Sequence, residues 1–335
     1  MIEVNMIFII AEIGVNHNGD IQIAKELLQE AKNAGADAVK TQSFYAEKIA
    51  SRFAQKADYQ HKTTSSGESQ LNMLQKLQLS YGMLSELFEF AGKIGITLFS
   101  TPFDIQSIDD LVSLDNPIFK IPSGEITNLP YMISIAKLKK KTILSTGMST
   151  LDEVSQAVEI LKQHGCEDLT LLHCNTQYPT PLEDANVRAI VTLRDTFGLP
   201  VGYSDHTQGM EAALAAVSLG ATVIEKHFTL SCEMQGPDHK ASMEPEAFAQ
   251  MVTAIRKIET ALGNGEKVVT ESEKGNLAVA RKSIVAKRGI KAGETFSDEN
   301  ITTKRPGNGI SPMRWFEVLG KTAKRDFEVD ELVDI

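Results

Sequence analysis

The chain has 335 residues, 42% of them hydrophobic and 23% charged, so a wholly disordered protein is excluded. Its net charge of −10 argues against nucleic acid or an anionic membrane as the main partner. The first apolar run, residues 6–10, is too short to span a bilayer and follows no basic segment, which predicts a soluble, cytoplasmic protein. Three cysteines without a CxxC spacing indicate neither a disulfide framework nor a thiolate zinc site.

Most of the chain alternates short apolar runs with amphipathic stretches. The runs typical of buried strands are residues 8–14, 38–44, 97–103, 118–124, 142–147, 169–175, 200–206 and 222–228. Buried strands that alternate with helices need crossover connections and a parallel sheet. Eight such units predict an α/β fold with a (β/α)8 TIM barrel, and a doubly wound open sheet is the alternative.

Polar side chains stand at the C-terminal ends of these runs. They are Glu12, Lys40, Gln42, Thr101, Lys120, Ser123, Glu125, Ser145, Asn175, Ser204, His206 and the three residues Glu225, Lys226 and His227. In a barrel these ends meet at one mouth, where the active sites of barrel enzymes lie. The barrel therefore gathers these groups in one place, whereas an open sheet leaves the coincidence unexplained.

Two lysines and a glutamate lie inside apolar strands, where an unpaired charge is costly. Lys40 and Lys120 would repel each other at one mouth unless an anion lay between them, which favours a phosphate-bearing substrate. The alternative is that they form structural ion pairs with Glu12 and Glu125. For the segment after Glu12, the alternative to a functional site is an Asn/Gly turn that caps the next helix at Asp20.

His206 and His227 end adjacent predicted strands. Their imidazoles are in a position to share one divalent cation, with water, substrate oxygens or Asp238 as further ligands. The alternative is a pair of hydrogen-bonded core histidines.

Two segments depart from the strand and helix pattern. Residues 46–80 form a polar insertion, and a substrate loop or lid and a tolerated surface insertion both remain open. After residue 265 we predict a connector, 266–280, and then a small β-rich domain, 281–335, with short strands and turn signals. This domain carries eleven lysines and arginines against nine acidic residues, whereas residues 1–280 carry a net charge of −12, and the opposite signs suggest that the domain docks on a barrel.

The motifs together resemble a known family, the sialic acid (N-acetylneuraminate) synthases. The matching segments are 11–19 (AEIGVNHNG), 99–103 (FSTPF), 120–125 (KIPSGE), 144–148 (LSTGM), 202–206 (GYSDH), 225–229 (EKHFT), 236–239 (GPDH) and 304–309 (KRPGNG). The resemblance implies a TIM barrel followed by an antifreeze-like (SAF) domain. It also implies condensation of phosphoenolpyruvate with open-chain N-acetylmannosamine, carbon–oxygen cleavage that releases phosphate, and a divalent metal, usually manganese, with magnesium or cobalt as alternatives.

The resemblance also implies roles for individual residues. Phosphoenolpyruvate would contact Lys40, Thr101, Lys120, Ser123, Ser145, Asn175 and Ser204. The metal would be held by His206 and His227, while Glu12, Gln42, Glu125 and Asp238 would handle proton transfer, water and sugar hydroxyls. Arg305 would reach the sugar from the partner subunit, which predicts a domain-swapped homodimer.

Three other functions remain open. A legionaminate or other nonulosonate synthase would use a 2,4-diacetamido-trideoxy hexose in place of N-acetylmannosamine. A synthase for a phosphorylated aldose would need a second basic cluster at the mouth. A carbohydrate-binding or ice-binding protein, from a different functional class, would leave the barrel inert.

Overall fold

A computed structural model describes residues 6–51, 53–56 and 69–335. The chain divides into two compact units, Met1–Asn264 and Gly265–Ile335. None of the described helices combines the length and the apolar character needed to cross a membrane.

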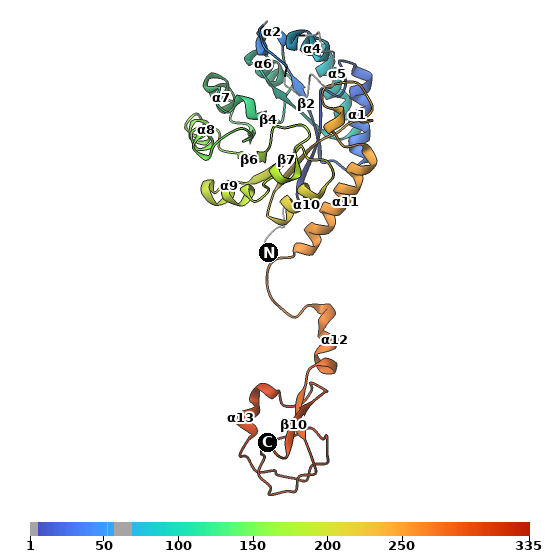
Figure 1. Ribbon diagram of the computed structural model, residues 1–335, viewed down its shortest axis with the longest axis vertical. Helices are drawn as coiled ribbons and strands as arrows, with labels where there is room; N and C mark the ends of the chain where they lie inside the picture. The colour runs from blue at the N-terminus through green and yellow to red at the C-terminus, as the bar shows by residue number, and fades with distance from the viewer. Residues whose placement is uncertain (1–5, 52, 57–68) are drawn as a thin grey trace. The chain divides into compact units, whose positions relative to one another are not determined.

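The first unit alternates strands and helices (Figure 1). The strands are β1 (Phe8–Gly14), β2 (Ala38–Ser43), β3 (Thr97–Pro102), β4 (Ile118–Ile121), β5 (Lys141–Ser145), β6 (Leu169–Cys174), β7 (Val201–Asp205) and β8 (Val223–His227). The helices are α1 (Ile21–Asn33), α2 (Ala46–Ile49), α4 (Gln70–Leu77), α5 (Tyr81–Ile94), α6 (Ile105–Ser113), α7 (Leu129–Ala136), α8 (Leu151–Gln163), α9 (Ala189–Phe197), α10 (Glu211–Ser218) and α11 (Pro245–Leu262). Each predicted strand is present, with ends that differ by up to three residues.

The sheet is a parallel barrel. Its strand order is β3-β2-β1-β8-β7-β6-β5-β4, so β1 pairs with both β2 and β8, and β3 and β4 lie against each other where the order ends. Asn116 joins this seam, because its buried amide accepts a hydrogen bond from Ser100 N and donates to the carbonyl oxygens of Ser100 and Ile118. The predicted TIM barrel is confirmed, and the open-sheet alternative is wrong.

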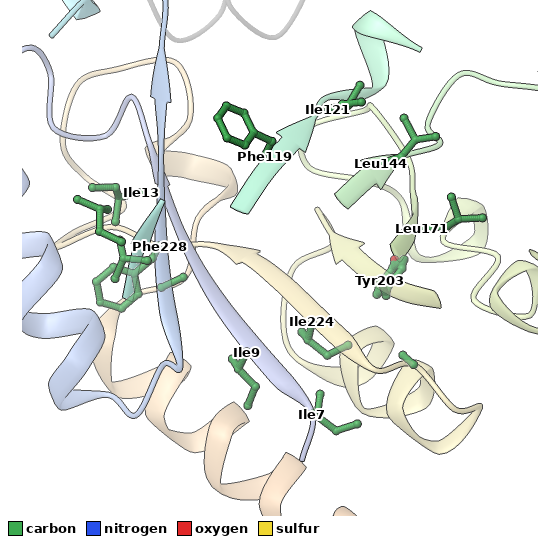
Figure 2. Close-up of a cluster of buried hydrophobic side chains, with 14 of the residues drawn as sticks. Ile7, Ile9, Ile13, Phe119, Ile121, Leu144, Leu171, Tyr203, Ile224 and Phe228 are labelled. Carbon is green, nitrogen blue, oxygen red and sulfur yellow. The ribbon is translucent and has the colours of Figure 1, made fainter. Parts of the chain in front are cut away.

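The alternation of side chains along each strand separates the core from the site. Outward residues such as Ile9, Phe119 and Ile224 pack in the layer between strands and helices (Figure 2). Inward residues near the strand starts fill the barrel floor, namely Ile10, Ala38, Phe99, Ile118, Ile143, Leu172 and Val223. The next inward positions, two residues later, carry polar groups such as Glu12, Lys40 and Lys120. The period of two therefore places these groups above an apolar floor.

A lysine on the outer face of the barrel is also paired. Lys226, between the inward residues Glu225 and His227, forms a buried ion pair with Asp205 at 2.8 Å. At the entrance to α1, the side chain of Asp20 accepts hydrogen bonds from Gln22 N and Ile23 N. The turn interpretation thus holds for Asp20, while Glu12 lies inside the barrel.

The second unit contains α12 (Glu271–Ala280) and the antiparallel strands β9 (Ser283–Ala286) and β10 (Ile301–Lys304), followed by α13 (Trp315–Val318). A separate apolar cluster, which includes Ile284, Phe296 and Phe327, forms its core. The predicted small β-rich domain is confirmed. Residues 266–280, which we predict as a connector, include α12, and the division of the chain assigns this helix to the second unit.

Candidate active site

A cavity of about 440 Å³ lies at the C-terminal ends of the barrel strands. Twelve of the fourteen predicted site residues line it: Glu12, Lys40, Gln42, Thr101, Lys120, Ser123, Glu125, Ser145, Ser204, His206, His227 and Asp238. The barrel thus brings together groups that are up to 226 positions apart in the sequence, counted from Glu12 to Asp238.

Buried ion pairs form the centre of the cavity. Lys40 Nζ lies 2.6 Å from Glu12 Oε2 and 3.8 Å from Glu225 Oε1, and Lys120 Nζ lies 3.2 Å from the same Glu225 oxygen. The ion-pair alternative named Glu12 and Glu125 as partners, and of these Glu12 pairs with Lys40. Glu125 forms no such pair in the described structure, because it lies beyond the strand, at the rim, and accepts a hydrogen bond from Asn128 Nδ2 at 2.6 Å.

The charges of this cluster depend on one another. Burial acts to raise the pKa of Glu225, but Lys120 and Lys40 outweigh it and bring the value to about 2. Burial acts to lower the pKa of Lys40, but Glu12 and Glu225 raise it above its ordinary value. Burial lowers the pKa of Lys120, and the Lys40 charge adds to that effect while Glu225 opposes it. Glu225 therefore opposes the effect of burial on the pKa of both lysines.

Hydroxyl groups surround the lysines. Lys40 Nζ donates to Thr101 Oγ1 at 3.2 Å, and Ser204 Oγ donates to Glu225 Oε1 at 3.1 Å. Ser123 Oγ accepts from Gly147 N at 3.0 Å. Within the described residues, Ser145 Oγ and Glu225 Oε2 are buried without a hydrogen-bond partner. Buried polar atoms are rarely left unpaired, so these two atoms indicate a ligand or ordered water.

Two histidines stand side by side at the ends of β7 and β8, with ring centroids 5.3 Å apart. His206 Nδ1 bonds to the carbonyl oxygen of Asn175 at 2.5 Å, and His227 Nδ1 is buried, unpaired among the described residues and 4.0 Å from Asp238 Oδ2. Burial lowers the pKa of His206 to about 4 and that of His227 well below its ordinary value, so both rings are neutral at pH 7. His206 Nε2 lies 3.4 Å from Ser204 Oγ. Neutral imidazoles are common ligands of divalent cations, and the unpaired His227 Nδ1 fits such a site. The described residues contain no group of three or more His, Cys, Asp or Glu that would complete such a site, so water or substrate would supply the other ligands.

Two carboxylates, those of Glu12 and Asp238, also line the cavity. Glu12 Oε1 accepts a hydrogen bond from Gln42 Nε2 at 3.0 Å. Burial and the nearby Glu12 charge raise the pKa of Asp238 to about 7. The segment that carries Asp238 is fixed by Asn16, whose amide donates to Phe228 O and to Ser242 Oγ. Asn16 thus has a structural role behind the site.

Two predicted residues do not line the cavity. The side chain of Asn175 accepts a hydrogen bond from Gln177 N at 2.7 Å, so in this structure it caps a turn. Arg305 belongs to the second unit, where its Nε donates to the carbonyl oxygen of Ala280 at 3.0 Å.

Several residues of the cavity have functions or positions that the sequence does not predict. The sequence places Glu225 at the mouth, as a carboxylate within an apolar strand, but not as the partner of both lysines. Tyr178 lies with its ring centroid 4.1 Å from that of His206, and no pattern in its loop pointed to this contact. The insertion also contributes, since Ile49 of α2 and Leu74 of α4 line the cavity, whereas residues 57–68 lie outside the described part of the chain.

The fold and the mouth together define a TIM-barrel enzyme with a second, SAF-like domain. Residues 27–267 match the NeuB family and residues 281–334 match the SAF domain, and the chain belongs to the NeuB family. The resemblance to the sialic acid synthases is confirmed.

Three comparisons show where the chain lies among its relatives. It is 54% identical to the N,N'-diacetyllegionaminic acid synthase of Campylobacter jejuni, over 97% of this chain and 98% of that protein. It is 39% identical to a pseudaminic acid synthase of the same species, over 96% and 94%. The solved N-acetylneuraminic acid synthetase of Leptospira borgpetersenii, in complex with citrate, has a TM-score of 0.72 and 34% identity, over 82% of this chain and 90% of that one. These values favour the nonulosonate alternative over N-acetylneuraminate synthesis.

Proposed function

We propose that the protein condenses phosphoenolpyruvate with the open-chain form of a 2,4-diacetamido-trideoxy hexose and releases phosphate. The product is a nine-carbon acid of the legionaminate type. The observation that carries the choice of sugar is the 54% identity to a diacetyllegionaminic acid synthase over nearly the whole of both chains. The observation that carries the reaction class is the pair of buried lysines among hydroxyls at the barrel mouth.

The lysine and hydroxyl cluster supports the binding of phosphoenolpyruvate. Glu12 and Glu225 balance Lys40 and Lys120 in the absence of ligand, so the ion-pair interpretation holds for the free protein. Phosphate and carboxylate oxygens accept charge-assisted hydrogen bonds, and the ammonium groups together with Ser145 Oγ supply donors for them. The same lysines therefore form ion pairs with Glu12 and Glu225 in the free protein and would bind the substrate anion in the complex.

A divalent cation would be held by His206 and His227, with manganese proposed first and magnesium or cobalt as alternatives. When bound, it would supply Lewis-acid polarisation of the sugar aldehyde. The roles of the protein side chains do not depend on which cation is used.

The proposed reaction balances in three steps. C3 of phosphoenolpyruvate attacks the sugar aldehyde carbon, and the aldehyde oxygen takes up a proton. Water then adds to the cation at C2 and loses a proton, which gives a tetrahedral phosphohemiketal. The C2 hydroxyl then loses its proton and becomes the keto oxygen as the bond between C2 and the bridging oxygen breaks, and phosphate leaves with the electrons of that bond and takes up a proton. Glu12 and Asp238, both buried at the mouth, are the proposed groups that hold and move these protons, and Gln42 orients Glu12.

A substrate panel tests this function. Phosphate release would be measured with phosphoenolpyruvate and, in turn, the diacetamido sugar, N-acetylmannosamine and arabinose 5-phosphate. We expect the highest kcat/KM with the diacetamido sugar. The lysines lining the described part of the cavity are Lys40 and Lys120, so a second basic cluster for a sugar phosphate is not found there. Calorimetric sugar binding without any turnover would favour the carbohydrate-binding alternative.

We further propose that the second domain acts on the barrel of a partner chain in a domain-swapped homodimer. The support is the resemblance of residues 304–309 to the family motif, together with the opposite charge signs of the two parts of the chain. In this arrangement Arg305 would contact the sugar.

A further inference from the structure

One side of the cavity is apolar, in contrast to the charged centre. We call it the apolar wall, and it consists of Val15, Phe44, Ile49, Met73, Leu74, Leu77 and Phe103. Val15, Phe44 and Phe103 follow β1, β2 and β3, while the other members belong to α2 and α4 of the insertion. Met73 and Leu77 are buried in packing contacts, but Ile49, Leu74 and Phe103 keep part of their surface exposed on the cavity side.

Phe103 of the apolar wall lies across the mouth from His206. Phe103 follows β3 and His206 follows β7, and these strands are four steps apart in either direction around the eight-stranded barrel. Val15 follows β1, which pairs with β8, so the wall also reaches the side of the mouth that carries His227. A sugar whose aldehyde carbon lies at the histidines can therefore contact the wall with its far end, carbons 4 to 6.

The chemistry of the wall discriminates between the candidate sugars. N-acetylmannosamine carries hydroxyls at carbons 4 and 6, and burying them against apolar side chains without partners is costly. The 2,4-diacetamido-trideoxy sugar carries a methyl group at carbon 6 and an acetamido methyl at carbon 4, both of which gain from apolar contact. One polar residue, Gln70, also lines this side, and its amide suits the single carbonyl oxygen of the 4-acetamido group.

We infer that the apolar wall determines sugar specificity, by favouring the deoxy, diacetamido end of the substrate over a hydroxylated one. This inference rests on the proposed function, and it assigns part of the selectivity to α2 and α4 of the insertion. Ile49 and Leu74 would then contact the substrate.

Two variants test the inference. Leu74→Gln places an amide on the wall, and Phe103→Tyr adds a single hydroxyl to a ring that packs edge-on against Phe44 with centroids 6.4 Å apart. The matched control is Leu262→Gln, an exposed position at the end of α11 that does not line the cavity. For each protein, kcat/KM would be measured for the diacetamido sugar and for N-acetylmannosamine, together with KM for phosphoenolpyruvate and the thermal unfolding midpoint.

We expect each wall variant to lower the preference for the diacetamido sugar by about tenfold or more, the scale on which a pocket discriminates small apolar groups. KM for phosphoenolpyruvate and the selectivity of the control should stay unchanged. An unchanged selectivity ratio in folded Leu74→Gln or Phe103→Tyr would overturn the inference while leaving the proposed function intact. A wild-type protein that turns over neither sugar would overturn both.

Discussion

The carboxylate of Glu225 lies 3.2 Å from the ammonium of Lys120, and both side chains are buried at the barrel mouth. The same oxygen lies 3.8 Å from Lys40. One carboxylate thus lies between two lysines that would otherwise repel each other, while Glu12, 2.6 Å from Lys40, supplies the second negative charge.

Glu225→Gln should destabilise the free protein. Removing one partner of a buried ion pair costs roughly 3–5 kcal/mol, because the remaining charge is left uncompensated. Added inorganic phosphate should stabilise this variant more than the wild type, since it restores negative charge near the lysines. Chemical unfolding with and without phosphate measures both effects. Glu183→Gln, an exposed control, should change the free energy of unfolding by less than about 0.5 kcal/mol, and an equally small change for Glu225→Gln would contradict the account.

His206→Ala and His227→Ala should each weaken the binding of manganese. Each change removes one of two neutral imidazoles, and the loss should exceed about tenfold, the lower end of what even an outer-shell change costs. Titration calorimetry with Mn²⁺ measures the affinity directly, and chelation should abolish turnover until manganese is added back. His164→Ala is the control, because its ring bonds to Ile160 O outside the cavity. Full activity in metal-free buffer would show that no metal is needed.

Acid should destabilise the barrel through His17. Burial lowers the pKa of this side chain from 6.5 to about 4. Between these values the unfolded chain binds more protons, so the contribution of His17 is complete above pH 6.5 and is lost as the pH falls towards 4. The loss is about 3 kcal/mol from this residue, at 1.36 kcal/mol per pKa unit.

Unfolding curves across pH 4 to 7 measure this effect. His17→Asn is the matched variant, because a short amide can still accept the hydrogen bond that Gly19 N donates to His17 Nδ1 at 3.0 Å. The dependence of stability on pH should be shallower in His17→Asn. Identical slopes in the two proteins would exclude His17 as the cause.

Arg305→Ala should raise KM for the sugar and leave KM for phosphoenolpyruvate unchanged, because a charged contact to the sugar is removed. Glu12→Ala should be inactive, because a proposed proton-transfer group of the barrel is lost. The two variants would be mixed, re-equilibrated and assayed at a sugar concentration well below the KM of Arg305→Ala, where each alone has little activity. If the second domain serves a partner chain, the mixture should be more active than either variant, because one mouth then has both residues. A mixture no more active than the sum of its parts, or a wild-type protein that sediments as an active monomer, would contradict the domain-swapped dimer.

The fold was predictable because alternating apolar runs and helices admit few arrangements. The strand ends were predicted less well. The predicted strand at residues 118–124 is longer than β4, because Pro122 ends the hydrogen-bonded ladder and a short helical turn follows it. Most of the site was also predictable, since polar residues at strand ends share one mouth. The partners of the lysines were not predictable, because Glu225 lies inside β8 whereas Glu125 lies in the helical turn that follows β4. The apolar wall was not predictable from the sequence, because its apolar side chains cannot be distinguished there from residues of the hydrophobic core.

The proposed condensation releases phosphate by carbon–oxygen cleavage. This can be measured with phosphoenolpyruvate that carries heavy oxygen at the bridging position, the diacetamido sugar and the wild-type protein, with mass analysis of both products. We expect the label to leave entirely in the phosphate and an unlabelled nine-carbon acid to form. Label retained in the acid, or no phosphate release with this sugar, would contradict the proposed reaction.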